Sequence, residues 1–196
     1  MADTVWCELI VTGPDDAVEE FDGIAGRSFE YSDFLPMPDG LVFDKPDRRG
    51  IPALPDGWAD DGWGYARRQI EAGIRQIPTG SNGTDWMLRN WGQTRRRPQD
   101  FLRHGVQRRN GTTRHYTFAT AWGAPLELLL GISRRFRASF FDLRYAGGAG
   151  EAGWAIFADG RIALDEHWKG REAYDRLAAL DSKLAADFDV CPDHEG

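Results

Sequence analysis

The chain has few cysteines, no long apolar run and no leader-like N-terminus. Its two cysteines, Cys7 and Cys191, lie far apart and match no metal-binding or redox spacing, so the sequence does not indicate a disulfide framework. No stretch approaches the roughly 18 apolar residues of a membrane span, and the start of the chain lacks a basic region followed by an apolar run. We therefore expect a cytoplasmic protein without a membrane partner.

Motifs for catalysis and for metal binding are also missing. The four histidines are not spaced as zinc ligands, and there is no Gly-x-Ser-x-Gly elbow or Walker loop. "GAGEAG" at residues 148–153 matches the dinucleotide fingerprint in letters, but strand patterns flank it on both sides, and a phosphate site of that kind needs a following helix. The sequence thus predicts no cofactor, no metal and no catalytic residue.

Hydrophobic periodicity predicts an alternation of strands and helices. Alternate residues are apolar where a half-buried strand is expected, and apolar residues three or four apart follow a proline where a helix is expected. Asp159-Gly160 stands between two alternating runs and is typical of a two-residue hairpin turn. The predicted elements are strands at 4–12, 28–35, 114–122 and 138–145, helices at 14–25 and 125–136, a hairpin over 154–164 and a C-terminal helix at 169–188.

This order predicts a single domain of the α+β class. Strand, helix, strand repeated twice is the ferredoxin-like split βαβ sandwich, an antiparallel sheet with helices on one face. Residues 4–35 and 113–168 form its core, and the hairpin and the C-terminal helix are additions to it. Residues 36–112 read as a large insertion after the second strand, since five of the ten prolines fall between 36 and 64; one helix is predicted within it at 63–77.

Positive charge is concentrated in one segment of an otherwise acidic chain. The formal net charge is -7, yet residues 89–114 carry eight bases and one acid. Arginine pairs with phosphate or carboxylate through two parallel hydrogen bonds, and neighbouring aromatic rings suit base stacking. The candidate ligand-binding residues are Trp91, Arg95, Arg96, Arg97, Arg103, Arg108 and Arg109. Two alternatives stay open. The arginines are solvated or pair with acids of the chain's own fold or of a partner subunit, and the tryptophans pack in the core or within the insertion.

Five motifs together resemble a known family. They are "WCELIVTGP", "FLPMPDGL", "NWGQ", "FATAWGAPLELL" and "GWAIFADGRI", in this order along residues 4–165. The sequence in this respect resembles the YubB ferredoxin-like domain family of uncharacterised proteins from conjugative plasmids and phages. The resemblance implies a ferredoxin-like domain without an iron–sulfur cluster and an accessory role in a mobile genetic element or its bacterial host. It implies no activity, and the chain departs from the family pattern after "NWG".

We expect a non-enzymatic binding module whose arginine-rich segment contacts a nucleic acid or an acidic protein surface. The first alternative is a structural domain that forms homo-oligomers through its sheet and has no polyanion ligand. The second is a small enzyme with a site in the insertion.

Overall fold

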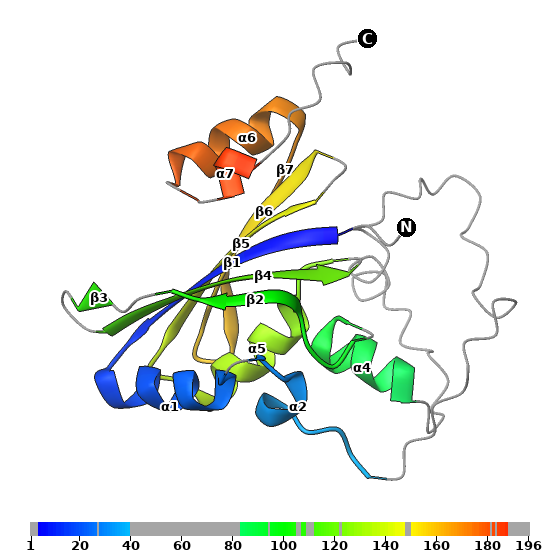
Figure 1. Cartoon of the computed structure of the whole chain (residues 1–196), viewed down its shortest axis with the longest axis vertical. Helices are drawn as coiled ribbons and strands as arrows, with labels where there is room; N and C mark the ends of the chain where they lie inside the picture. The colour runs from blue at the N-terminus through cyan, green and yellow to red at the C-terminus, as the bar shows by residue number, and fades with distance from the viewer. Residues whose placement is uncertain are drawn as a thin grey trace, which may run out of the picture.

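The computed structural model describes residues 4–26, 28–39, 83–93, 95–104, 107–108, 112–121, 123–147, 150–180, 182 and 184–187. They form an α+β fold around one antiparallel sheet (Figure 1). Its strands are β1 (Thr4–Gly13), β2 (Gln99–Arg103), β3 (Gln107–Arg108), β4 (Thr112–Ala121), β5 (Phe140–Gly147), β6 (Glu151–Ala158) and β7 (Arg161–Lys169). The helices are α1 (Asp15–Ala25), α2 (Tyr31–Phe34), α4 (Gly83–Trp91), α5 (Leu126–Arg135), α6 (Gly170–Ala179) and α7 (Leu184–Asp187).

β1 lies in the middle of the sheet. The strand order is β2-β4-β1-β5-β6-β7, with β3 also paired to β4, and β1 runs antiparallel to both β4 and β5. The predicted face of β1 is confirmed, because Val5, Cys7, Leu9 and Val11 are at most 1% exposed. Side chains alternate between the two faces of a strand, so Glu8 points to the opposite face, where it is also buried.

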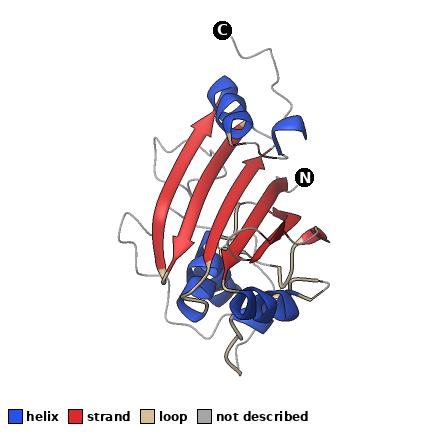
Figure 2. Ribbon diagram, turned by 90° about the vertical axis from the view of Figure 1, so that its left-hand side faces the viewer, coloured by secondary structure: helices blue, strands red, loops and turns tan. Residues whose placement is uncertain are grey.

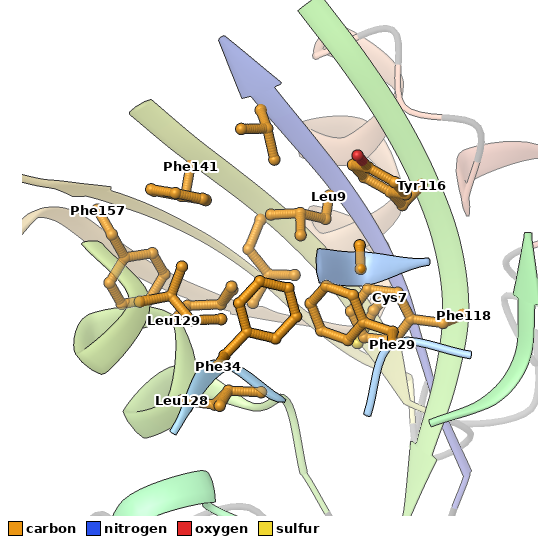
Figure 3. Close-up of a cluster of buried hydrophobic side chains, with 14 of the residues drawn as sticks. Cys7, Leu9, Phe29, Phe34, Tyr116, Phe118, Leu128, Leu129, Phe141 and Phe157 are labelled. Carbon is orange, nitrogen blue, oxygen red and sulfur yellow. The ribbon is translucent and has the colours of Figure 1, made fainter. Parts of the chain in front are cut away.

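The main core fills the space between the sheet and a helical layer formed by α1, α2, α4 and α5. The apolar stripes predicted for two of these helices are confirmed, since their members are buried: Val18, Phe21 and Ala25 in α1, and Leu128, Leu129 and Ile132 in α5. Figure 3 shows side chains of α2 and α5, together with Phe29, meeting those of β1, β4, β5 and β6. Aromatic rings make up much of the core, and Phe21 lies at their centre.

The strand predicted at 28–35 is wrong. Residues Tyr31–Phe34 form the short helix α2, and Phe29 has a φ of 51°, in the left-handed region rather than the extended region of a regular strand. A helical turn places Tyr31 and Phe34 on one side, and both are buried in the main core. The position next to β4 is instead taken by β2, which comes from the arginine-rich segment.

Residues 83–112, which composition assigns to an insertion, contribute directly to the main core. α4 supplies Trp91, which is fully buried there, and β2 extends the sheet beyond β4. The helix predicted at 63–77 lies outside the described residues. The core thus includes part of the segment that proline content and charge set apart.

The two sandwich helices, α1 and α5, lie on one face of the sheet as predicted, but the added C-terminal helices lie on the other face. In Figure 1, α6 and α7 lie across the sheet from α1 and α5, and Figure 2 shows them at one end of the sheet. They cover Ala146, Ala152 and Trp168, which face away from the main core. The single C-terminal helix predicted at 169–188 is divided in two, because α6 ends at Ala179 and α7 begins at Leu184.

The β6–β7 hairpin has the predicted turn. Asp159 and Gly160 have φ angles of 46° and 72°, and a type I′ turn requires positive φ at both central positions. The hairpin extends the sheet beyond β5 by two strands.

Gly153 in β6 leaves room for the ring of Tyr145 to lie over the strand. Tyr145 lies directly opposite Gly153, and a Cβ atom at Gly153 would come 2.3 Å from Cζ of the buried Tyr145 ring. We expect Gly153→Ala to lower the free energy of unfolding by about 1–3 kcal/mol, the usual cost of overpacking a core. Urea denaturation monitored by circular dichroism measures this change.

Gly23→Ala is the matched control for that substitution. A Cβ atom at Gly23 would meet nothing within 4 Å, and alanine favours the helix that contains it. The control should be as stable as the wild type or slightly more stable. If Gly153→Ala behaved like the control, the placement of Tyr145 over β6 would be wrong.

Candidate functional site

The loop between α4 and β2 is fastened to the fold at four points. The Trp91 indole is fully buried, and its Nε1–H donates to the carbonyl of Leu35 at 3.0 Å. Gln93 is 2% exposed and donates from Nε2 to the carbonyl of Gly123 at 2.6 Å. The Tyr31 amide donates to the carbonyl of Arg96 at 2.8 Å, and Pro98 is buried. These contacts use backbone groups and side chains other than the loop arginines.

The three arginines of this loop project outward. Arg95, Arg96 and Arg97 are all exposed. Nη1 of Arg97 lies 3.6 Å from Oε1 of Glu30, and because the Arg97 side chain is 65% exposed, water screens this pair. Within the described part of the chain, Arg95 has no ion-pair partner. The structure therefore places the predicted residues Arg95, Arg96 and Arg97 next to one another on one solvent-facing loop.

Arg103 and Arg114 instead hold α1 against the sheet. Nη1 of Arg103 and Nη2 of Arg114 lie 3.1 Å and 3.0 Å from the same oxygen of Asp22, a carboxylate 6% exposed. The Tyr116 hydroxyl donates to its other oxygen at 2.9 Å. Burial and the neighbouring Asp22 raise the pKa of Tyr116, which stays a donor at neutral pH. The open alternative of internal pairing thus applies to Arg103.

The remaining predicted site residues do not join the exposed loop. Trp91 cannot offer a ring face to an outside ligand, because it is 0% exposed and packs edge-to-face against Trp86 at 5.3 Å. Arg108 belongs to β3, but its side chain, like the whole of Arg109, lies outside the described residues.

The aromatic rings near the arginines are used inside the fold. Phe101 stacks on Tyr116 and on Phe29, with centroids 5.7 Å and 5.4 Å apart. Trp86 is half-buried against Trp91. In the described ranges, no exposed aromatic side chain stands in sequence between α4 and the end of β2.

A second group of polar residues, which sequence reasoning missed, surrounds Glu8 on the other face of the sheet. The Glu8 carboxylate is 1% exposed; its Oε1 lies 2.8 Å from Nε2 of His115, and its Oε2 accepts from the Ser182 hydroxyl at 2.5 Å. Nη1 of Arg144 lies 3.7 Å from Oε2. Burial by itself would raise the pKa of Glu8, but the hydrogen bonds and charges of these neighbours outweigh it and lower the pKa.

Cys7 and the possible metal ligands among the described residues can be assessed directly. Cys7 is fully buried, and burial raises the pKa of its thiol to about 12, so it stays protonated at neutral pH. Among these residues no three histidine, cysteine or carboxylate side chains gather as metal ligands. The described helices are all too short or too polar to cross a bilayer.

The fold defines an α+β protein with an antiparallel sheet, and one solved structure supports this class. The chain is similar to the crystal structure of protein api92 from Yersinia pseudotuberculosis, of the DUF1281 family, with a TM-score of 0.51 and 12% sequence identity. The likeness covers 87% of this chain and 99% of that protein and concerns the fold alone. No protein-family model matches the chain, and no curated protein does.

Proposed function

We propose that the protein is a binding module that contacts an anionic partner through Arg95, Arg96 and Arg97. The observation that carries this proposal is the anchored loop: its backbone, Trp91 and Gln93 are tied to the core while the three guanidinium groups face solvent. An anchored loop loses little conformational freedom on binding, which favours affinity. Because water screens exposed charges, their contribution to the stability of the fold is small.

The charge distribution supports the same proposal. The loop lies in a segment with seven more bases than acids, within a chain of net charge -7. Glu30 and Asp33 flank Tyr31, whose amide donates to the carbonyl of Arg96, and Glu30 meets Arg97. A compact basic site bordered by acids suits a small group of carboxylates or phosphoryl groups better than a long polyanion.

An acidic protein surface fits this site better than a nucleic acid does. Proteins that bind single strands combine positive charge with aromatic rings on which bases stack. Here Trp91 and Phe101 are committed to the core or to internal stacking. Arginine can still pair with carboxylates through its two parallel donors without any ring.

The fold assignment is proposed on the strand order. The stretch β5-β1-β4-β2 supports a ferredoxin-like split βαβ core, with β2 in place of its second strand and β6, β7, α6 and α7 added. From the five sequence motifs we also propose a relationship to the YubB ferredoxin-like family. This relationship implies an accessory role on a plasmid or a phage.

The salt dependence of binding tests the proposed function. We expect the protein to bind a labelled oligoglutamate peptide, and fluorescence anisotropy at rising salt should show steadily weaker binding, because counter-ions screen exposed charges. A labelled single-stranded oligonucleotide of equal charge should bind more weakly. Three phosphate contacts with a single strand give a slope of log affinity against log salt of about -2. If the oligonucleotide binds more tightly than the peptide and shows this slope, the partner is a nucleic acid. No binding of either probe at low salt would overturn the proposal.

A further inference from the structure

The α6–α7 segment is fastened to the second face of the sheet by its connector. Ser182 donates from its hydroxyl to Glu8, and Arg144 donates from Nη1 to the carbonyl of Leu180 at 2.8 Å. The Ser182 hydroxyl also accepts from the amide of Leu184 at 3.2 Å, so one side chain joins the start of α7 to β1. Both ends of the connector thus depend on a charged group of the sheet.

The charges around Glu8 come from several elements. His115 of β4 and Arg144 of β5 face it directly. Behind them, Asp142 of β5 pairs with Nη2 of Arg144 at 3.2 Å, and the ring of His104 lies 4.8 Å from that of His115. From the connector, the described residues bring only the Ser182 hydroxyl and the Leu180 carbonyl, neither of which titrates. Glu8 therefore faces the imidazole of His115 on one neighbouring strand and the guanidinium of Arg144 on the other.

An apolar cluster also lies under the segment. Its buried members in the sheet are Ala146, Ala152 and Trp168, and those in the segment are Ala173, Leu177 and Leu184. Trp154, Leu180 and Ala185 pack against them and are partly buried. The hydrogen bonds to Glu8 and Arg144 add to this contact, and hydrogen bonds to charged groups are stronger than neutral ones.

We propose that the α6–α7 segment is a releasable cap, latched through Ser182 and Leu180 to ionised Glu8 and to Arg144, and that neutralising Glu8 opens it while the rest of the sheet stays folded. The cap rests on one end of the second sheet face (Figure 2), so its release uncovers Ala146, Ala152 and Trp168. This inference is independent of the arginine loop on the other side of the molecule.

The pH dependence of the latch follows from the sign of the Glu8 shift. The folded state lowers the pKa of Glu8 from its ordinary value of 4.5. Its ionised form therefore stabilises the latched state above that value, and this contribution is lost as the pH falls through the lower folded pKa. Glu8→Gln reproduces the neutral side chain at neutral pH.

Hydrogen–deuterium exchange of the full chain at neutral pH tests the latch. In Ser182→Ala we expect exchange in peptides from residues 170–187 to rise by about 10- to 100-fold, because a hydrogen bond to a charged group is lost. Glu8→Gln should raise it at least as much. Peptides from β4 and α5 should be unchanged in Ser182→Ala. Ser133→Ala, which removes another buried hydroxyl, one that donates to the carbonyl of Leu130 at 2.9 Å, should leave residues 170–187 unaffected.

Two results would overturn the latch. One is unchanged exchange over residues 170–187 in Ser182→Ala, which would show that apolar packing alone holds the segment. The other is an equal rise across α6, α7, β4 and α5, which would show that the segment opens only with the whole fold. Ser182→Ala leaves Glu8 with His115 and Arg144, so it decides the matter even if Glu8→Gln fails to fold.

Discussion

Replacing Phe21 with alanine should lower the free energy of unfolding by about 3–5 kcal/mol, the usual cost of removing a buried aromatic side chain. Phe21 is 0% exposed and projects from α1 into the space between the helical layer and the sheet. Five rings surround it at centroid distances of 5.0–6.1 Å: Phe29, Phe34, Tyr116, Phe136 and Phe141. Because these rings belong to different elements, they cannot close together over the cavity without moving the elements.

Thermal and urea denaturation measure this loss. For a chain of this size the expected change corresponds to a fall of roughly 6–20 °C in Tm. Phe140→Ala is the matched control, because Phe140 is 58% exposed in β5 and a surface substitution of this kind changes stability by only about 0.5 kcal/mol. A Phe21→Ala variant that lost no more stability than Phe140→Ala would contradict the described core.

Regular, half-buried elements could be predicted from the sequence because the spacing of their apolar residues shows which face is buried. Every second residue of β1 from Val5 to Val11 is apolar, and α5 repeats apolar residues on one side; both patterns correspond to buried faces. The Asp159-Gly160 turn was predictable for another local reason, since its conformation depends on the two residues themselves.

The elements that were mispredicted depend on distant partners. Phe29, Tyr31 and Phe34 allow either an alternating strand or a helical turn, and the Tyr31 amide is satisfied by Arg96, which lies far along the chain. Of the five residues of β2, only Phe101 packs against the core. The other four are exposed, so hydrophobic periodicity did not indicate a strand here. In both cases tertiary contacts decided the local structure.

The candidate site was predictable in composition but not in detail. The run of arginines marked the segment, yet the sequence does not tell that Arg103 reaches Asp22, 81 residues away, while Arg95 faces solvent. The cluster around Glu8 joins residues 174 positions apart. The available signals were an acid in the middle of the apolar strand β1 and Arg144 within β5, each of which also fits a solvent-facing position.

The largest expected effect on binding is that of removing the loop arginines. If two of Arg95, Arg96 and Arg97 make charge-assisted hydrogen bonds to the partner, each worth about 1.5 kcal/mol, their loss weakens binding by about two orders of magnitude. The fold should be unaffected, because the loop is anchored through Trp91 and Gln93. Far-ultraviolet circular dichroism and Tm of the triple variant check this.

A control of equal charge exists at the end of α5. Arg134, Arg135 and Arg137 are exposed and lie in or next to the last turn of that helix. Their replacement by alanine also removes three positive charges, but from another part of the molecule. Comparing the two triple variants separates contact at the loop from a general change in net charge.

The affinity of these two variants for the labelled oligoglutamate peptide, measured side by side at low salt, tests most directly whether the loop arginines bind the partner. The predicted result is a loss of about 100-fold for Arg95→Ala/Arg96→Ala/Arg97→Ala and less than about threefold for Arg134→Ala/Arg135→Ala/Arg137→Ala. Equal losses in the two variants, or wild-type affinity in the first, would contradict it.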